Sequence, residues 1–283
     1  GKDFGYRFLW RLALLGVFAT WNAAFFPAGD VLLLFVVVGV VLFLTRSWSD
    51  RAIGVAAVVL LLQPVEWYHY IANLINPAHR LPDLKVAEMY GEVADYTKAG
   101  NWRDFLLGNV TLGQKASFLW AVNAGRFVQT AGLFLLGFFI GRKQLFMTNE
   151  KNIAFGTKVL IISAISFAPL YTLKELVMEN DPIVQQTVGT AFDMWQKLAF
   201  TLVLVASFIL LYQHKNFSKA VAGLRFYGKM SLTNYISQSI IGVFIYFPIG
   251  LNLTPYCGYT FSLLVGFLIF LLQLRFCKWW LAR

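Results

Sequence analysis

The stretch "FYGKMSLTNYISQSIIGVFIYFPIG" (residues 226–250) joins a polar half to an apolar half. Its second half has the composition of a membrane-spanning helix. Its first half carries six hydrogen-bonding side chains, which are Ser231, Thr233, Asn234, Ser237, Gln238 and Ser239. Ser231, Asn234 and Gln238 fall on one helical stripe. Such residues allow close interhelical hydrogen bonding. Together with Lys229 they also suit the lining of a cytoplasm-facing vestibule, and the sequence leaves both interpretations open.

The composition of the whole chain agrees with a membrane protein. Of the 283 residues, 58% are hydrophobic and only 13% are charged, and the mean hydropathy is +0.63. A soluble domain is about 45–50% apolar and about 25% charged. Cys257 and Cys277 lie near opposite ends of the last apolar segment, so we expect neither a disulfide nor a cysteine-based metal site. The sequence therefore predicts an all-α, polytopic transmembrane helix bundle that forms a single integral membrane domain over residues 1–283.

Eight apolar segments are candidates to cross the bilayer, which takes roughly 20 residues per helix. They are residues 8–26, 30–45, 52–72, 118–141, 157–175, 195–213, 231–250 and 258–277. All of them should be helical, because lipid offers no partner to an unpaired backbone group. Pro64, Pro169 and Pro248 fall inside these segments, and each predicts a kink.

Charge predicts the orientation of these segments. The ends and alternate loops, at residues 1–11, 46–51, 141–158, 214–229 and 275–283, hold 16 of the 24 lysine and arginine residues but only three of the 14 acidic ones. By the positive-inside rule this set is cytoplasmic, so both ends of the chain face the cytoplasm. The net charge of +10 is then a topological signal and an attraction to anionic lipid. No basic, aromatic-interleaved soluble module is present, so nucleic-acid binding is not expected.

One long segment, residues 73–117, is expected on the extracytoplasmic side. Within it, "DLKVAEMYGEVADYTKAG" places apolar residues at helical spacing, which predicts an amphipathic helix. This helix would rest at the membrane interface or cap a cavity between the spanning helices. A solvated connector is the alternative, and the sequence does not choose between them.

Polar residues inside the apolar segments indicate where a site lies, because each is costly in hydrocarbon. Arg126 lies in "SFLWAVNAGRFVQTAGLFLLGFFIGR", and a continuous helix would stack Asn123, Arg126 and Gln129 on one face. Glu66, in "LLLQPVEWYHY", lies at a similar depth and is the expected partner of Arg126. The pair would either fix helix register or leave the arginine to bind an anion or a headgroup in an outward cavity.

Other intramembrane polar groups have simpler interpretations. Asp30, after Gly29 in "FFPAGDVLLL", is expected to cap the helix that follows it. His69 lies near the outer boundary, where interfacial histidines are common. The chain has no metalloprotease, nucleophile-elbow or P-loop motif and no carboxylate cluster with di-metal spacing, so we expect no metal.

Three motifs carry a resemblance to a known family. The segment "GKMSLTNYISQS" is similar to a G-[RK]-M-[AS]-L-T-N-Y-x-x-Q-S signature. The segment "RLALLGVFATWNAAFFPAGDVLLL" is similar to R-L-x-x-L-x-x-F-G-x-x-H-x(6)-G-D-I-L, and "RFVQTAGLFLLGFFIGR" to R-x-x-Q-T-x-x-L-F-L-L-G-x-x-x-G-R. In this order they resemble the YeiB-like bacterial inner-membrane proteins that carry domain of unknown function 418. Because such proteins usually have further N-terminal helices, and because this chain starts at Gly1 and stops at "KWWLAR", we expect both ends to continue in a longer protein.

The resemblance implies a distant relationship to transmembrane acyltransferases, which move an acyl group from cytoplasmic acyl-CoA to an acceptor such as a glycan. A histidine commonly serves there as general base, and the matching residue in this chain is Asn22. An amide takes up no proton at neutral pH, so general-base catalysis at this position would be lost. The asparagine at the position of the family's histidine leaves open whether the chain is an enzyme at all.

Three functions of different class follow from these observations. An acyltransferase-like enzyme would bind acyl-CoA near Lys229, Asn234 and Gln238 and a glycan or lipid acceptor near Arg126 and Glu66. A transporter or flippase of an anionic or lipidic solute would use Arg126 as its anchor, and a non-catalytic scaffold is the third. The catalytic candidates are Asn22, Glu66 and His69. The substrate-binding candidates are Glu66, Asn123, Arg126, Gln129, Asp30, Lys229, Asn234 and Gln238.

Overall fold

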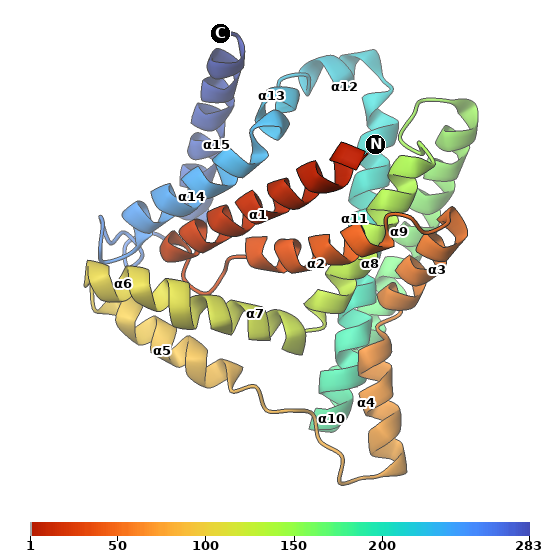
Figure 1. Cartoon of the computed structure of the whole chain (residues 1–283), viewed down its shortest axis with the longest axis horizontal. Coiled ribbons are helices and arrows are strands. Elements are labelled where there is room, and N and C mark those ends of the chain that lie inside the picture. The colour runs from red at the N-terminus through yellow and green to blue at the C-terminus, as the bar shows by residue number, and fades with distance from the viewer. Residues whose placement is uncertain (1) are drawn as a thin grey trace. The chain divides into compact units, whose positions relative to one another are not determined.

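The computed structural model describes residues 2–283, with side chains from Phe4 onward, and Gly1 lies outside the described residues. The described chain is helical, with no strand (Figure 1). Its α-helices are α1 Lys2–Phe25, α2 Leu32–Thr45, α3 Asp50–Leu61, α4 Pro64–Ile75, α5 Val86–Lys98, α6 Trp102–Gly108, α7 Gln114–Asn123, α8 Arg126–Arg142, α9 Glu150–Met178, α10 Pro182–Val184, α11 Thr190–Tyr212, α12 Lys215–Ala220, α13 Leu224–Lys229, α14 Ser231–Tyr246 and α15 Tyr259–Leu281. Two π-helical turns, η1 Asn109–Gly113 and η2 Gln185–Gly189, continue α6 into α7 and α10 into α11.

Four to six of these helices are long and apolar enough to cross a membrane. Four qualify singly over residues 4–25, 150–178, 182–212 and 259–281, and two bent pairs raise the number to six. The count of about eight is not confirmed. The reason is length: α2 has 14 residues and α14 has 16, each less than the roughly 20 needed for a perpendicular span.

Two expected continuous segments are broken instead. Within residues 52–72, α3 ends at Leu61 and α4 begins at Pro64 with a bend of 51°. Proline disfavours the α conformation in the residue before it, and Gln63 has a left-handed backbone with φ 59°. Within residues 118–141, the bend is 76° at Gly125, whose φ is 64°.

The remaining prolines differ in their effects. Pro169 lies inside α9, as expected. Pro64 starts a helix rather than kinking one, because the first helical position needs no N–H donor. Pro248 lies beyond the end of α14 at Tyr246, in a turn. The helix expected over residues 231–250 therefore ends before its proline.

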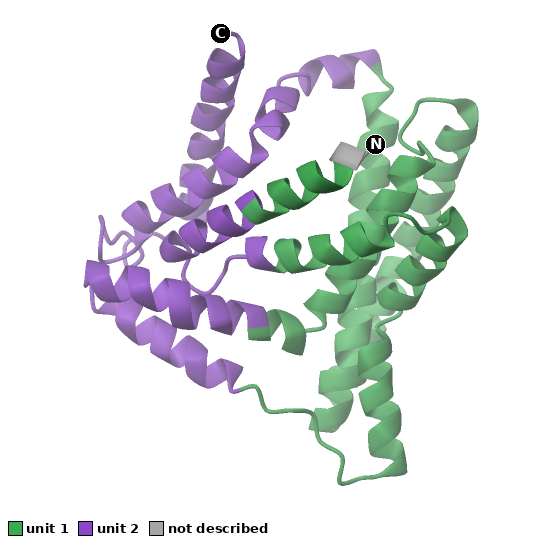
Figure 2. Ribbon diagram, in the orientation of Figure 1, with its two compact units in different colours: residues 1–13, 34–84, 119–214 green, residues 14–33, 85–118, 215–283 purple. Residues whose placement is uncertain are grey.

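The described chain divides into two compact units of interleaved segments (Figure 2). Unit 1 comprises residues 1–13, 34–84 and 119–214, and unit 2 comprises residues 14–33, 85–118 and 215–283. The two units are described separately below.

Unit 1 is organised around two helix pairs, α3 with α8 and α9 with α11. Ile53, Ala57 and Leu135 form the core of the first pair, each no more than 1% exposed. Gly54 and Gly132 let these helices approach closely, since a Cβ on Gly132 would lie 2.9 Å from a carbon of Leu61. Small residues at a helix interface are the usual means of close packing in membranes.

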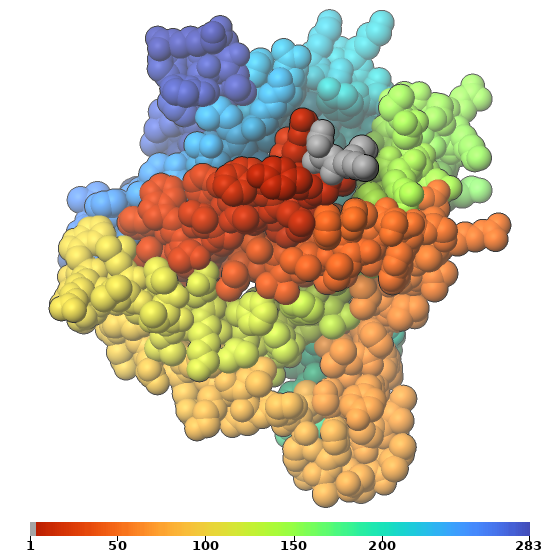
Figure 3. Space-filling model, viewed as in Figure 1, coloured from red at the N-terminus to blue at the C-terminus, as the bar shows by residue number. Residues whose placement is uncertain are grey.

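Unit 2 has its own core, in which Phe105 packs with Val243 and Ile249. Helix α5 lies within the segment expected to hold an amphipathic helix, and it buries Met89, Val93 and Thr97. It packs against α6 and η1, and in the space-filling view the two helices form one continuous yellow surface (Figure 3). The helix is therefore packed on protein along one face.

Candidate functional site

A buried carboxylate, Asp30, is the centre of a polar cluster in unit 2. It lies on the connector between α1 and α2 and is 5% exposed, while Asn22 on α1 is fully buried. Oδ1 of Asp30 accepts three hydrogen bonds, from Asn22 Nδ2 at 3.2 Å, from the Leu32 N–H at 3.1 Å and from the Tyr235 hydroxyl at 3.2 Å. The Leu32 bond caps the start of α2, as the sequence predicts.

Two further hydrogen bonds hold the connector itself. Ser117 Oγ, on α7, donates to the Asp30 carbonyl at 2.9 Å, and the Tyr90 hydroxyl, on α5, donates to the Ala28 carbonyl at 2.9 Å. Ala28 has a left-handed backbone with φ 46°, which costs free energy in a residue that carries a Cβ. Helices α5 and α7 therefore fix the loop on which the carboxylate is carried.

Two acceptor atoms of this cluster have no hydrogen-bond partner among the described residues. They are Asp30 Oδ2 and Asn22 Oδ1, and both are buried. An unsatisfied buried acceptor costs about 1–3 kcal/mol. A hydroxyl of a bound molecule would satisfy one of these atoms, and a primary amine or two hydroxyls could satisfy both.

Helix α5 is tied to the same unit by a second tyrosine. The Tyr96 hydroxyl donates to Asn109 Oδ1 at 2.8 Å, and Asn109 Nδ2 donates to the Ala24 carbonyl, at the end of α1, at 3.0 Å. Burial raises the pKa of Tyr96 to about 12. Gly113 is required beside it, because a Cβ there would lie 3.0 Å from the Tyr96 hydroxyl oxygen.

The polar residues of the stretch 226–250 are engaged in a network between helices of unit 2. Asn234 donates to the Tyr227 carbonyl at 3.1 Å, and Gln238 donates to the Tyr227 hydroxyl at 2.8 Å and to Gln273 Oε1 at 3.0 Å. Lys229 is exposed at the end of α13. These bonds account for Asn234 and Gln238 as residues that hold α13, α14 and α15 together. No described contact joins them to Lys229 in a shared site.

The second polar region lies in unit 1, where the two helix breaks meet. Gln63 Nε2 donates to the Gly125 carbonyl at 3.5 Å. Glu66 Oε1 lies so close to Gly125 that a Cβ there would be 2.7 Å from it. Gln63 Oε1 and Glu66 Oε2 are buried without a hydrogen-bond partner in the described chain. Trp195 Nε1 donates to the Leu61 carbonyl at 2.9 Å, which satisfies an acceptor freed by the first break.

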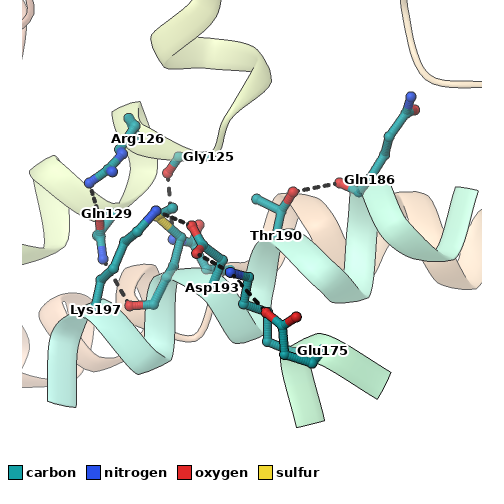
Figure 4. Close-up of polar contacts among 11 residues, drawn as sticks. Gly125, Arg126, Gln129, Glu175, Gln186, Thr190, Asp193 and Lys197 are labelled. Carbon is teal, nitrogen blue, oxygen red and sulfur yellow. Dashed lines mark hydrogen bonds and ion pairs between the residues drawn. The ribbon is translucent and has the colours of Figure 1, made fainter. Parts of the chain in front are cut away.

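In the described chain no ion pair within 4.0 Å joins Arg126 to Glu66, although both residues lie beside Gly125. Its guanidinium instead donates to Gln129 Oε1 at 3.5 Å and lies 5.9 Å from the centroid of the Trp120 ring. Gln129 Nε2 in turn donates to the Met194 carbonyl at 3.0 Å. Figure 4 shows Arg126 and Gln129 side by side at the start of α8.

The expected stacking of Asn123 with Arg126 is wrong. The break at Gly125 separates the two residues, so that Asn123 ends α7 with an exposed side chain while Arg126 begins α8. Glycine permits this turn because its left-handed φ carries no steric cost. Gln129, four residues after Gly125, stays on the buried side of α8 as expected.

A charged network in unit 1 was not anticipated. Asp193, on α11, pairs with Lys197 and with Lys174 of α9 at 3.6 Å, and Lys174 also lies 3.5 Å from Glu175 (Figure 4). Two lysines thus share one partly buried carboxylate. The sequence signal was available, since Asp193 and Lys197 are four residues apart in one helix.

His69 has a histidine partner. Its Nδ1 lies 3.0 Å from His79 Nε2, and the two rings stack with centroids 5.3 Å apart. His79 belongs to the loop after α4, so the pair links that loop to its helix. Within the described chain, neither ring forms a hydrogen bond or ion pair with Glu66, and no group of three histidine, cysteine or acidic side chains could hold a metal ion.

Two residues of these sites escaped the sequence analysis. Tyr235 lies in "LTNY" beside residues that were selected, but an aromatic residue in an apolar helix gives no signal of its own. Gln63 gave a clearer one, because the residue before a proline tends to end a helix. Two of the family motifs meet in the Asp30 cluster: Asp30 of "RLALLGVFATWNAAFFPAGDVLLL" accepts a hydrogen bond from Tyr235 of "GKMSLTNYISQS".

Comparison with known proteins gives a family. The family model described as "Protein of unknown function (DUF418)" matches residues 140–283, which include the motif "GKMSLTNYISQS" and the end of "RFVQTAGLFLLGFFIGR". No curated protein and no solved structure matches the chain. Since the match covers half of the chain, and since it names the family that the motifs resemble, the chain belongs to the DUF418 family.

Proposed function

We propose that this membrane protein transfers an acyl group from acyl-CoA to a hydroxyl or amine of a glycan or lipid acceptor at the Asp30 cluster. The observation that carries the proposal is the arrangement of the carboxylate: Oδ1 is fixed by three donors, while the buried Oδ2 has no partner among the described residues. A carboxylate held in this way presents one oxygen to a substrate in a fixed direction, which is what a general base requires.

The residues of the cluster have separate roles in this reaction. Asp30 Oδ2 takes the proton of the acceptor as its oxygen or nitrogen forms a bond to the acyl carbonyl carbon. The carbon–sulfur bond of the thioester breaks, and the thiolate of coenzyme A leaves and takes up a proton from solvent. Asn22, a neutral amide, orients Asp30 through its Nδ2 and offers Oδ1 to a second donor of the acceptor.

The proposed setting is the bacterial inner membrane, with both ends of the chain in the cytoplasm. The asymmetry of lysine and arginine supports this orientation. Eight passages would require the bilayer to thin locally around the short helices α2 and α14, and each bent pair to count as one passage. A cysteine introduced at Tyr96 should react with an impermeant reagent in intact cells and one at Ser218 should not, whereas the reverse pattern would refute the orientation.

One observation favours a second function, transport of an anionic or lipidic solute. The two bent helix pairs resemble the discontinuous helices on which transporters build their sites. A transporter would bind its solute without consuming acyl-CoA. A non-catalytic scaffold would neither bind a solute nor consume acyl-CoA.

Purified full chain incubated with labelled acetyl-CoA tests the proposal. We expect slow hydrolysis or transfer by the natural chain. Asn22→His should raise the rate by about tenfold or more, because an imidazole hydrogen-bonded to Asp30 adds a base to the cluster. Acetyl-CoA left intact by both proteins, each shown to be folded, would contradict the proposal and leave transport or scaffolding.

A further inference from the structure

The two helix breaks of unit 1 bring together two buried side-chain oxygens that accept no hydrogen bond in the described chain, Gln63 Oε1 and Glu66 Oε2. Both breaks have left-handed residues, Gln63 with φ 59° and Gly125 with φ 64°. Left-handed backbone in a glutamine costs about 1–3 kcal/mol and persists only where the surroundings enforce it. The side chains of Gln63 and Glu66 both approach Gly125, since a Cβ there would lie 3.5 Å from Gln63 Oε1 and 2.7 Å from Glu66 Oε1.

These acceptors are buried and unpaired. Gln63 is 0% exposed and Glu66 is 7% exposed. Gln63 Oε1 and Glu66 Oε2 have no hydrogen-bond partner in the described chain. Gln63 uses its only donor group toward the Gly125 carbonyl, at 3.5 Å. Two acceptors therefore face the same place, and no donor of the described chain reaches either of them.

The charge of Glu66 is also uncompensated. It lies in the first turn of α4. The neighbouring cations have other partners: Arg126 donates to Gln129, and Lys174 and Lys197 pair with Asp193. No ion pair within 4.0 Å involves Glu66 in residues 4–283. A buried charge without a counter-ion is strongly disfavoured, and a bound cation would remove that cost.

We propose that Gln63 and Glu66 bind a sodium ion at the meeting of the two helix breaks. Hard monovalent and divalent cations take oxygen ligands, and this site offers an amide oxygen and a carboxylate. One carboxylate balances one positive charge, which suits a monovalent ion. Broken helices in membranes are a known setting for such sites, because their unwound backbone adds carbonyl oxygens.

This inference does not depend on the acyl-transfer proposal, because it concerns other residues in the other unit. It gives the protein a cation dependence of stability. An ion that binds only the folded state stabilises it in proportion to the logarithm of its concentration once the site is filled. Because Gly125 excludes a Cβ from the place where Glu66 lies, the ligands are held in position before the ion arrives.

The experiment measures thermal unfolding of the purified full chain in detergent, in sodium chloride and in choline chloride at equal ionic strength. We expect the midpoint to rise with sodium concentration and to saturate. Glu66→Gln should abolish the rise. Glu175→Gln is the matched control, since it makes the same chemical change at an exposed glutamate of the same unit and should leave the response intact.

A second variant and a direct binding measurement keep the test decisive. Gln63→Met retains the size of the side chain and removes Oε1, and should weaken binding of radiolabelled sodium by more than the roughly tenfold that loss of an outer-shell partner costs. If Glu66→Gln does not fold, sodium binding by Gln63→Met tests the proposal in its place. No response of the natural chain to sodium, an unchanged response in Gln63→Met, or a dependence on pH alone would overturn the proposal, the last by showing that a proton serves instead.

Discussion

Asp30 in unit 2 and Glu66 in unit 1 are carboxylates of almost equal burial that differ in the donors around them. Each keeps one buried oxygen without a partner among the described residues, Asp30 Oδ2 and Glu66 Oε2. Both lie where a helix begins, and they are 5% and 7% exposed. Asp30 Oδ1 accepts hydrogen bonds from a side-chain amide, a backbone N–H and a phenol. Glu66 Oε2 has no partner among the described residues, and no cation lies within ion-pair distance. Burial alone therefore does not determine what a membrane carboxylate does; the donors around it do.

The comparison predicts unequal responses to mutation, and the largest effect is expected at Asp30. Asp30→Ala leaves the Asn22 amide, the Leu32 N–H and the Tyr235 hydroxyl without their acceptor. Buried hydrogen bonds to a charged group contribute about 1.5–3 kcal/mol and orphaned donors cost about 1–3 kcal/mol. We expect the free energy of unfolding to fall by about 2–4 kcal/mol, measured by denaturant titration in detergent.

Glu66→Gln is the matched variant for this measurement. In sodium-free buffer it removes a charge that has no internal partner and keeps the shape of the side chain. The change should be within about 1 kcal/mol, or stabilising, because no described donor loses its acceptor. Equal losses in the two variants would show that the carboxylates do not differ in the way that their contacts indicate.

A smaller effect is expected when one donor is removed from Asp30. Tyr235→Phe deletes the hydroxyl that donates to Oδ1 at 3.2 Å and keeps the ring beside Phe26. The carboxylate retains two donors, so the loss should be about 1 kcal/mol, the net contribution of one hydrogen bond. The same titration measures it, with Tyr68→Phe, on an exposed tyrosine of unit 1, as the control. A loss as large as that of Asp30→Ala would mean that Tyr235 alone organises the cluster.

Much of the helical structure could be predicted from the apolar blocks, and the breaks could not. Each of the eight expected segments contains at least one helix, because a long apolar block has few alternatives in lipid. Whether a helix continues through "LLQPVE" or "NAGRF" depends on the tertiary contacts available to the freed carbonyls. The Leu61 carbonyl accepts a hydrogen bond from Trp195 Nε1, which is 134 positions away in the sequence. No local pattern encodes that partner.

The polar residues of the two regions could be predicted from the sequence, but the contacts between them could not. Asn22, Asp30, Glu66 and Arg126 all lie in the polar regions described above, because polar side chains in apolar segments are rare. Their partners depended on the fold. Arg126 was assigned to Glu66 from matching depth, and the two do lie beside the same glycine, but the turn at Gly125 directs the guanidinium to Gln129.

The measurement that tests the account most directly is acetyl-CoA turnover by Asp30→Asn. Asn22 and Tyr235 would still find an oxygen at position 30, while the base would be gone. We predict that the rate falls by about a hundredfold or more, as expected for the loss of a general base. Asp95→Asn, at an exposed carboxylate of α5 in the same unit, should keep the natural rate. Turnover by folded Asp30→Asn equal to that of the natural chain would contradict the assignment of the Asp30 cluster as the reactive site.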